Sequence, residues 1–463
     1  MKKIFVLIMV VLFCTHLAEA QCWTKVSSGW FHNVAIQTDG TLWAWGRNNF
    51  GQLGDGSNID RTSPVQIGSG NDWAFVDSGD YHTIAIKNDG TLWSWGQNDS
   101  GQLGDGTFTN RNTPLQIGTD TNWHSVSLGT KFTLALKSNG EIWGWGETGS
   151  NQLGIGISAL NQNVPVHVGT DADWIAIAAG ANFGLAVKTN GTLWGWGDHN
   201  NAALGNGQIT GTTLHPTPSG AATNWAAIAT GNTTTLALRS DDTLWSWGGN
   251  TFGALGTGAA ANDPSEIPMQ VGNASDWAYI SMGRYHSYGL KSDNTLWIWG
   301  RNNAGQIGDG TTSDRFIPLQ VASGTTWLSA VGGDLHSIAI SEDFSLWSWG
   351  GNAYGQLGDG TSIGKLVPTP VGIPCSLATL PASRLSITIS PNPADDYFTI
   401  SNLPAIPNMT ITIINLLGQT VAAYQKLPDQ NLIDIPVRSL QSGIYIVKVI
   451  SAETTFSKKI SIQ

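Results

Sequence analysis

Four histidines occupy one position of a repeating pattern, and they are the first side chains in this sequence that could carry chemistry. They are His32, His82, His286 and His336. Imidazole binds transition metals and titrates near neutral pH, so a histidine cluster would bind a metal ion or respond to acid. In the remaining repeats the same position holds an aromatic or hydroxyl side chain: Phe132, Phe183 and Thr234. Because aromatic and hydroxyl side chains can replace the histidine, we expect the position to have a structural role, near the channel of the ring-shaped fold that the repeat predicts below. Metal binding and pH sensing remain the alternatives.

Other patterns with catalytic or metal-binding potential carry less information. Residues 360–364 read Gly-Thr-Ser-Ile-Gly and match the Gly-x-Ser-x-Gly nucleophile elbow. That elbow needs a strand that turns into a helix, whereas this segment is expected to be a loop between strands. The sequence has no Cys-x-x-Cys, His-Glu-x-x-His or EF-hand spacing. The Asn/Asp/Gly-rich loops could chelate calcium, but turn formation explains them. We therefore predict a protein that is not an enzyme, with no metal site and no cofactor.

A repeat of about fifty residues organises most of the chain. The signature Trp-x-Trp-Gly begins at residues 43, 93, 143, 194, 245, 297 and 347, and one further Trp precedes each copy at residues 23, 73, 123, 174, 225, 277 and 327. Together these positions hold 21 of the 22 tryptophans, so we expect nearly all of them to be packing residues of the repeat. A period of this length indicates a propeller or an array.

One repeat contains the signals of four short strands. Residues 73–79, 83–87, 91–96 and 114–118 alternate or end at glycine or proline, and Asn88-Asp89-Gly90 forms a hairpin turn between the second and third of them. Seven four-stranded units predict an all-β, seven-bladed propeller. The hairpin glycine is replaced in the last three units by Asp242, Asn294 and Phe344, so we expect those turns to change type.

The repeat resembles the regulator of chromosome condensation repeat family. The matching pieces in the second unit are Gly79, the run 82–85, Asp89-Gly90, Trp95-Gly96 and the run 101–104. The resemblance covers about residues 22–374 and implies a closed ring of seven blades. Ile155, Ala203 and Ala254 depart from its pattern. The founding member activates a nuclear GTPase and binds chromatin. Neither role suits an exported acidic chain, and the resemblance carries over no catalytic residue.

Composition and charge narrow the class of partner. Glycine contributes 57 residues, and only 12% of residues are charged against a typical share of about 25%. The formal net charge is −11, which repels nucleic acid and anionic membrane surfaces. Residues 21–383 carry a net charge of −13 and residues 384–463 a net charge of +1. We therefore expect the propeller to bind a neutral or basic partner and no nucleic acid.

Both ends of the chain predict export. Residues 1–20 combine Lys2 and Lys3, an apolar run and Ala18-Glu19-Ala20, as in a secretory signal peptide, and no other stretch is long enough to span a membrane. After the propeller (21–375) and a linker (376–384), residues 385–463 have the turn signals of a small immunoglobulin-like β-sandwich, with strands expected at 385–390, 397–401, 410–415 and 443–450. The runs 390–393, 415–418, 443–448 and 457–460 resemble the C-terminal sorting domain of the bacterial type IX secretion system. This resemblance implies contact with that machinery and release outside the cell or attachment to its surface.

The two cysteines beyond the signal peptide predict a disulfide across the seam of the ring. Alignment of the seventh unit with the first sets Cys375 on Asn71, while Cys22 precedes Trp23 as Asp72 precedes Trp73. Cys22 and Cys375 therefore fall at consecutive positions where the ring closes. An exported compartment permits disulfides, so we predict that these two residues are bridged.

The binding surface is predicted at one end of the propeller. An antiparallel meander sends the loop between strands one and two, and the Gly-rich loop between strands three and four, to the same end. The first of these loops varies between repeats, and recognition surfaces are enriched in Trp, Tyr and Arg. We predict a protein partner that contacts Trp30, Phe31, Asp80, Tyr81, Lys131, Asn182, Arg284, Tyr285 and Asp334. The alternatives are a carbohydrate-binding adhesin that uses the same aromatic residues and a hydrolase with an unidentified site.

Overall fold

The computed structural model describes two compact units, which comprise Met1–Ser376 and Leu377–Gln463. The described residues are 22–156, 160–372, 388–390, 394, 396–401, 410–415, 420–425, 432–438, 440, 443–450 and 455–462. The predicted signal peptide, Cys375 and the predicted linker lie outside these ranges. No helix in the described part of the chain is long and apolar enough to cross a membrane.

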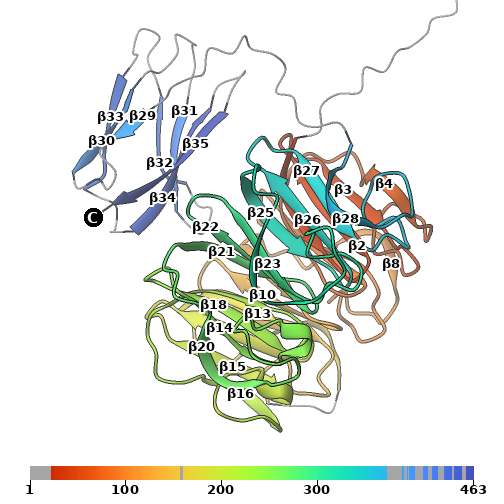
Figure 1. The fold of residues 1–463 in the computed structure, drawn as a ribbon. Coiled ribbons are helices and arrows are strands. Elements are labelled where there is room, and N and C mark those ends of the chain that lie inside the picture. Colours follow the sequence, from red (N-terminus) through yellow and green to blue (C-terminus); the bar gives the residue numbers. More distant parts are fainter. Residues whose placement is uncertain are drawn as a thin grey trace, which may run out of the picture. The chain divides into compact units, whose positions relative to one another are not determined.

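Seven sheets of four antiparallel strands form the first unit, which confirms the predicted seven-bladed propeller (Figure 1). Each blade is contiguous in sequence, and its strands pair in chain order. The strands of the first four blades are β1 (Trp23–Ser28), β2 (His32–Gln37), β3 (Leu42–Gly46), β4 (Arg61–Gln66), β5 (Trp73–Ser78), β6 (His82–Lys87), β7 (Leu92–Gly96), β8 (Arg111–Ile117), β9 (Trp123–Leu128), β10 (Phe132–Lys137), β11 (Ile142–Gly146), β12 (Gln162–His167), β13 (Trp174–Ala179), β14 (Phe183–Lys188), β15 (Leu193–Asp198) and β16 (Thr212–Pro218). Those of the last three are β17 (Trp225–Thr230), β18 (Thr234–Arg239), β19 (Leu244–Gly248), β20 (Ser265–Gln270), β21 (Trp277–Met282), β22 (His286–Lys291), β23 (Leu296–Gly300), β24 (Arg315–Val321), β25 (Trp327–Gly332), β26 (His336–Ser341), β27 (Leu346–Gly350) and β28 (Lys365–Pro370).

The tryptophans pack and link the blades, as the repeat predicted. The second Trp of each signature is fully buried and donates its indole N–H to a loop carbonyl of the preceding blade, as Trp95 does to Gln52 at 2.9 Å. Trp45 repeats this bond across the closing seam, where it donates to the carbonyl of Gln356 at 3.1 Å. The first and last blades, drawn at the red and cyan ends of the propeller's colours, therefore lie side by side (Figure 1). The ring closes by the contact that joins every other pair of blades.

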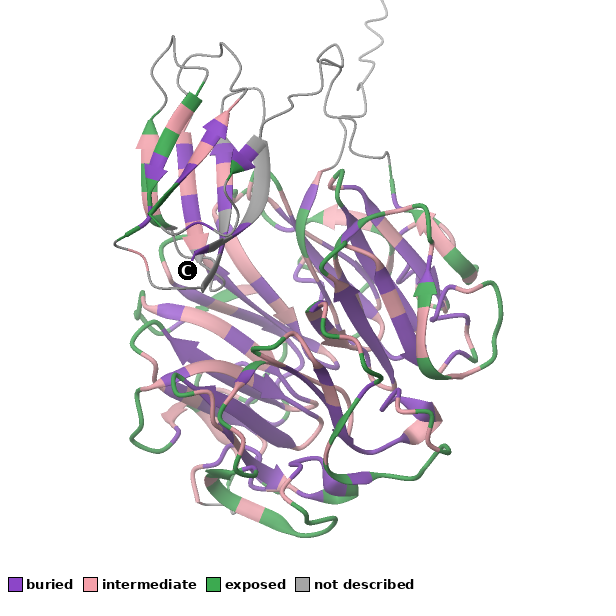
Figure 2. Ribbon diagram, turned by 60° about the vertical axis from the view of Figure 1, so that its left-hand side comes forward, coloured by how far each residue is buried: buried purple, intermediate pink, exposed green. Residues whose placement is uncertain are grey.

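Burial follows the position of a strand within its blade. All six residues of β10 are buried, whereas β4 at the outer edge holds none. Buried residues run along the inner strands and exposed residues gather in the loops (Figure 2). In the second blade the expected fourth strand begins three residues earlier than predicted, at Arg111.

The expectation that three hairpins change type is wrong. Asp242, Asn294 and Phe344 have φ of 60°, 63° and 63°, in the left-handed region that Gly90 occupies at 77°. Each donates its backbone N–H to the carbonyl three residues earlier, as Gly90 does to Lys87 at 2.9 Å. The turn is therefore kept, because its hydrogen bonds and the adjoining strands outweigh the local cost of a side chain at positive φ.

Two other departures from the repeat do change local structure. The side chain of Gln52 accepts a hydrogen bond from the backbone N–H of Phe50 at 2.9 Å, and equivalent bonds recur in blades two, three, six and seven. Ala203 and Ala254 cannot make this bond. Their loops instead form the 3₁₀ turns η1 (Asn200–Ala202) and η2 (Thr251–Gly253).

The second unit contains two β-sheets that share one apolar core. One sheet has the order β29–β30–β33 and the other the order β32–β31–β34–β35. Their buried residues include Ile389, Phe398, Ile413, Val447 and Ile460. This arrangement agrees with the predicted sandwich, although β32, β33 and β35 were not expected. The strands are β29 (Thr388–Ser390), β30 (Tyr397–Ser401), β31 (Thr410–Asn415), β32 (Thr420–Gln425), β33 (Leu432–Pro436), β34 (Gly443–Ile450) and β35 (Thr455–Ile462).

Candidate functional site

Seven equivalent glycines form the mouth of the central channel, each directly after the innermost strand of its blade. A Cβ atom on Gly79 would lie 2.4 Å from Cε1 of His82 and 2.9 Å from the carbonyl oxygen of Gly129. Only glycine therefore lets the strand ends converge this closely. The convergence leaves a cavity of about 110 Å³ lined by all seven blades. The glycines are Gly29, Gly79, Gly129, Gly180, Gly231, Gly283 and Gly333.

The residue after each glycine belongs to a collar of backbone hydrogen bonds, which joins six of the seven pairs of neighbouring blades around the mouth and is interrupted between the second and third blades. Asp334 N–H donates to the carbonyl of Trp30 at 3.1 Å, so the collar also crosses the closing seam. The remaining bonds are Trp30 to Asp80, Thr130 to Ala181, Ala181 to Asn232, Asn232 to Arg284 and Arg284 to Gly333. These bonds hold the variable loops in fixed positions, so their side chains form one defined surface.

The four repeat histidines lie between blades and are fully buried. The imidazole Nε2 of His32 is 3.1 Å from Oγ1 of Thr83 in the next blade, and His82 and Thr133 form the same link at 3.3 Å. Burial lowers the pKa of each of the four to about 3. Within the described residues, no group of three or more His, Cys, Asp or Glu side chains is placed to hold a metal ion. The geometry is that of an uncharged link between blades.

Five aromatic side chains from three blades form a continuous cluster beside the mouth, which we call the aromatic patch. Ring centroids are 5.2 Å apart for Trp30 and Tyr81, 5.3 Å for Phe50 and Tyr81, and 5.1 Å for Phe31 and Tyr354. Every member is partly exposed. The patch joins loops whose residues are more than 300 positions apart in sequence, because the seventh and first blades are neighbours.

Two members of the aromatic patch were not predicted. Phe50 and Tyr354 lie in the loops between strands three and four, at an equivalent position that holds Ser100 in the second blade. Each packs against the strand-one-to-two loop of the following blade. The variation at this position was a signal in the sequence, but the pairing across a seam depends on how adjacent blades are oriented.

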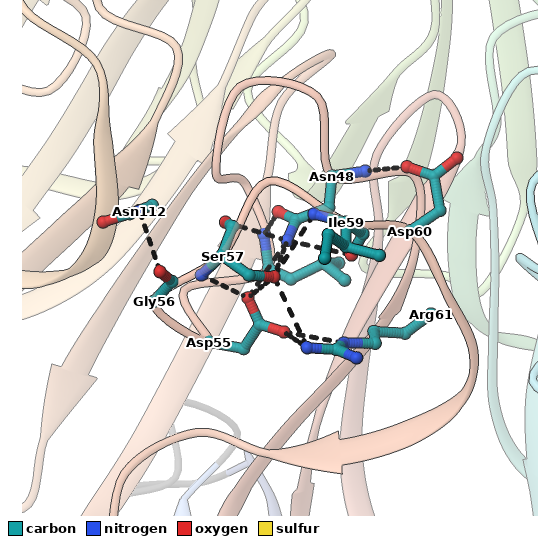
Figure 3. A network of polar contacts seen from close by, with 9 residues as sticks. Asn48, Asp55, Gly56, Ser57, Ile59, Asp60, Arg61 and Asn112 are labelled. Carbon is teal, nitrogen blue, oxygen red and sulfur yellow. Dashed lines mark hydrogen bonds and ion pairs between the residues drawn. The ribbon is translucent and has the colours of Figure 1, made fainter.

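A hydrogen-bond network fixes the loop that carries Phe50 (Figure 3). The buried side chain of Asn48 donates to the carbonyls of Ser57 and Ile59 at 3.1 and 3.2 Å, and its oxygen accepts from the N–H of Leu53 at 3.0 Å. Asp55, which pairs with Arg61, receives a further hydrogen bond from the same amide group at 3.1 Å. Burial would raise the pKa of Asp55, but hydrogen bonds from Ser57 and Arg61 hold it below its usual value. The loop oxygens that could have chelated calcium thus accept hydrogen bonds from an amide.

The same network explains the segment that matched a nucleophile elbow. Residues 360–364 lie between the strands β27 and β28, so no helix follows the serine. The carbonyl of Thr361 accepts from Asn352 at 3.1 Å, as Ser57 does from Asn48. The segment is a repeat of the structural loop.

Charged residues complete the face, and they differ in how well they are paired. The guanidinium of Arg284 lies 3.9 Å from the ring centroid of Trp30. Oδ1 of Asp334 is shared by two guanidinium groups, that of Arg301 at 3.3 Å and that of Arg284 at 3.9 Å. Asp80 is buried, and burial raises its pKa to about 8. Its Oδ2 has no hydrogen-bond partner among the described residues. The mouth therefore holds a carboxyl group that is mostly protonated, and so uncharged, at neutral pH.

The structure separates the predicted site residues into groups. Trp30, Phe31 and Tyr81 belong to the aromatic patch, and Asp80, Arg284 and Asp334 surround the mouth beside it. Tyr285 meets Phe252 edge to face, with ring centroids 5.7 Å apart, and the two rings form a second, smaller cluster with Arg301. The other two residues lie in the loops of the third and fourth blades: Lys131 pairs with Asp99 at 2.9 Å, and the carbonyl of Asn182 accepts from the N–H of Asp198.

Cys22 is disulfide-bonded. Its predicted partner, Cys375, lies outside the described residues, so the pairing Cys22–Cys375 remains a prediction. The carbonyl of Cys22 accepts a hydrogen bond from the N–H of Thr38, and Trp23 N–H donates to Phe344 across the seam. The position of Cys22 at the closing seam agrees with the alignment of the repeats.

Comparison with known proteins gives two families for the two units. The chain matches the RCC1-like domain over residues 114–385 and the regulator of chromosome condensation (RCC1) repeat over residues 39–86 and 89–136. Residues 388–463 match the secretion system C-terminal sorting domain. The second unit is therefore a sorting domain of the kind that the sequence resemblance indicated.

Individual relatives resemble the propeller only in part. The chain is 31% identical over 140 residues to the ultraviolet-B receptor UVR8 of Arabidopsis thaliana. The aligned residues make up 30% of this chain and 32% of that protein. It is 29% identical over 136 residues to the mitochondrial RCC1 domain-containing protein RUG3 of the same plant, 30% of whose length is covered. The chain thus spans about a third of the length of these two curated relatives.

A solved structure reproduces the fold over a larger part of the chain. The structure of Prp20p from Saccharomyces cerevisiae superposes with a TM-score of 0.65 at 23% identity, and covers 76% of this chain and 89% of that one. At this identity the likeness shows the fold alone. Because the RCC1-like domain matches more than half of the 463 residues, the protein belongs to the family of RCC1-like propellers.

Proposed function

We propose that this protein is an exported recognition module that binds a protein partner through the face around the channel mouth, with the aromatic patch at its energetic centre. The observation that carries the proposal is the patch itself. Five partly exposed aromatic side chains, with arginines stacked on them, form one surface on loops that the collar holds in place. Trp, Tyr and Arg dominate the binding energy of protein interfaces, and fixed loops reduce the entropy lost on binding.

The orientation of the rings favours a protein over a carbohydrate. Sugars stack on an open aromatic face, whereas arginine guanidinium groups lie over the rings of Trp30, Phe31, Tyr81 and Tyr354. The adjacent rings also meet mainly edge to face. Mixed aromatic and guanidinium surfaces suit the apolar and polar groups of a polypeptide.

The C-terminal unit supports the proposal that the protein acts outside the cell or on its surface. A secretion system sorting domain is consistent with type IX export and with a location outside the cell or on its surface. Deletion of residues 385–463 is expected to leave the propeller in the periplasm, which immunoblots of fractionated cells would detect. Unchanged export of the truncated chain would contradict the type IX assignment without affecting the proposed binding face.

The binding proposal is tested by affinity capture from the native extracellular environment. We compare the wild type with the triple variant Trp30→Ala/Tyr81→Ala/Tyr354→Ala. The control is Ile267→Ala/Ile317→Ala/Val367→Ala, which removes three exposed apolar side chains from the outermost strands β20, β24 and β28. We expect the patch variant to lose the partner recovered by both other proteins. Equal recovery by all three would show that this face is not the binding site.

A further inference from the structure

Arg47 lies at the centre of the aromatic patch. It directly follows β3, and its guanidinium carbon is 4.7 Å from the ring centroid of Tyr354, 5.5 Å from that of Tyr81 and 5.7 Å from that of Phe31. These rings come from the seventh, second and first blades. The backbone N–H of Arg47 donates to the carbonyl of Phe31 at 2.9 Å, which fixes the base of the side chain. Three rings and one hydrogen bond therefore hold a cation in a defined place.

The guanidinium of Arg47 has no acceptor. It carries five N–H donors, yet within the described parts of the chain no oxygen accepts a hydrogen bond from it or pairs with it as an ion. The side chain is only partly buried, so its donors remain open to a ligand. Aromatic faces satisfy the charge of a guanidinium but not its hydrogen bonds.

The sixth blade shows what an occupied version of this arrangement looks like. Arg301 directly follows β23 as Arg47 follows β3, and it stacks on Phe252 and Tyr285. Its guanidinium pairs at 3.3 Å with Asp334, the residue after the channel glycine of the next blade. The counterpart of Asp334 beside Arg47 is Asp80. The chain therefore has the same two residue types at both seams but forms the ion pair at only one of them.

The surroundings of Arg47 make the local charge positive. Arg284 lies at the inner edge of the aromatic patch on Trp30. Asp80 is buried with a pKa raised by burial to about 8, so it is mostly uncharged at neutral pH. Asp334 is a single carboxylate shared by Arg301 and Arg284, so these two arginines and Asp334 together keep one positive charge. A positive site within a chain of net charge −11 suits a single anionic group, whereas a polyanion such as nucleic acid would be repelled by the rest of the surface.

We infer that Arg47 binds the carboxylate of an aspartate or glutamate side chain on the partner protein. A planar guanidinium pairs with a carboxylate through two parallel hydrogen bonds, and the surrounding rings exclude water from that contact. The inference rests on the proposed function and specifies the chemistry of the partner: an acidic side chain next to apolar ones. It revises the expectation of a neutral or basic partner, which followed from the net charge of the whole propeller.

The test uses a phage-displayed library of random 12-residue peptides as the probe. The library is depleted on the Trp30→Ala/Tyr81→Ala variant and then selected on the wild-type full chain, so that only ligands of the aromatic patch remain. Binding of the selected peptides is measured by fluorescence polarisation to the wild type, to Arg47→Gln and to Lys365→Gln. The last variant removes one positive charge from the seventh blade outside the patch, and thermal melting checks that every variant is folded.

We expect the selected peptides to contain an aspartate or glutamate whose replacement by the amide weakens binding at least tenfold. Arg47→Gln should weaken the same peptides to a similar extent, and the two changes together should cost no more than either alone, because they remove one contact. Lys365→Gln should have less than a twofold effect. Patch-specific peptides that lack an acidic residue, or that bind Arg47→Gln as well as the wild type, would overturn this inference alone. If no peptide survives depletion on the patch variant, the proposed function fails with it.

Discussion

At the residue scale, the molecule depends on glycines and histidines that bring the strand ends together. In six of the seven blades the channel glycine packs directly against the ring of the histidine or phenylalanine three residues later, and the four histidines link neighbouring blades. The ring nitrogen Nδ1 of these histidines has no partner in the described structure, and burial keeps the ring neutral. The close packing of these histidines therefore depends on their imidazole rings remaining uncharged.

Gly129→Ala is expected to lower the free energy of unfolding by about 1–3 kcal/mol, the usual cost of overpacking. The added Cβ would lie 2.0 Å from the ring of Phe132 and 2.6 Å from the carbonyl oxygen of Gly180, so the seam must open. Urea unfolding followed by tryptophan fluorescence measures the change. Gly149→Ala is the control, because nothing lies within 4 Å of its Cβ. Equal midpoints for the two variants would contradict the packing account.

The buried histidines predict a loss of stability in acid. Burial lowers the pKa of His82 from 6.5 to about 3. Between these values the unfolded chain binds a proton that the folded chain does not, so stability is present above pH 6.5 and falls as the pH decreases. The loss is about 1.4 kcal/mol per pH unit for each such histidine.

His82→Phe, which copies the side chain of the third and fourth blades, should make unfolding less sensitive to pH between 7.5 and 5. Asp77 and Asp80, whose pKa values burial raises to about 6 and about 8, act in the opposite direction but are common to both proteins. Urea titrations give the change in the free energy of unfolding between the two pH values for each protein. The difference between wild type and variant in this change is the contribution of His82. The same pH dependence in wild type and variant would mean that His82 is charged in the fold.

At the scale of elements, the periodicity of tryptophan and glycine was sufficient to predict the blades, because each strand is a local alternation that ends at a turn. The loops that form the face around the channel mouth were also predicted, because the antiparallel order of the strands decides which loops emerge at the same end of the propeller. The partners Phe50, Tyr354 and Arg47 were not predicted, because their contacts cross a seam. In the second unit, β32, β33 and β35 were not predicted. Phe344 shows that a repeated framework can hold a hairpin against local preference.

Asn48→Ala is expected to loosen the long loop of the first blade. The substitution leaves the buried N–H of Leu53 without its partner, which costs about 1–3 kcal/mol, and it also frees the carbonyls of Ser57 and Ile59, which lie nearer the solvent. Hydrogen exchange should become faster across residues 50–60. Asn49→Ala, an exposed neighbour whose side-chain contact is one hydrogen bond with Gln52, should leave exchange unchanged. If the two variants exchange alike, the network does not hold the loop.

At the scale of the whole molecule, net charge and local charge point to different partners. The chain carries a net charge of −11, yet Arg47 and Arg284 make the aromatic patch positive. The net charge of the chain could therefore argue against a nucleic-acid partner, but it could not predict the sign of the charge that the partner carries where it meets the aromatic patch. Ring closure is also a property of the whole molecule, because the seventh blade completes the aromatic patch through Tyr354.

The predicted Cys22–Cys375 bridge would tie the two ends of the ring. Loss of a bridge that closes so long a segment is expected to cost about 2–5 kcal/mol. A peptide containing both residues should appear in mass spectra of a non-reduced digest, and Cys22→Ser/Cys375→Ser should unfold at lower temperature. A free Cys375 thiol in the native protein would disprove the pairing.

The central claim is that the aromatic patch contacts a protein partner, and site-specific photocrosslinking tests it most directly. A photoreactive p-benzoylphenylalanine replaces Phe50 within the patch or, as a control, Val367 on the outermost strand β28, and the exported protein is irradiated in its native environment. We predict one discrete crosslinked protein from position 50, absent when Trp30→Ala is added, and none from position 367. Equal crosslinking from both positions, or a product that is unaffected by Trp30→Ala, would contradict the account.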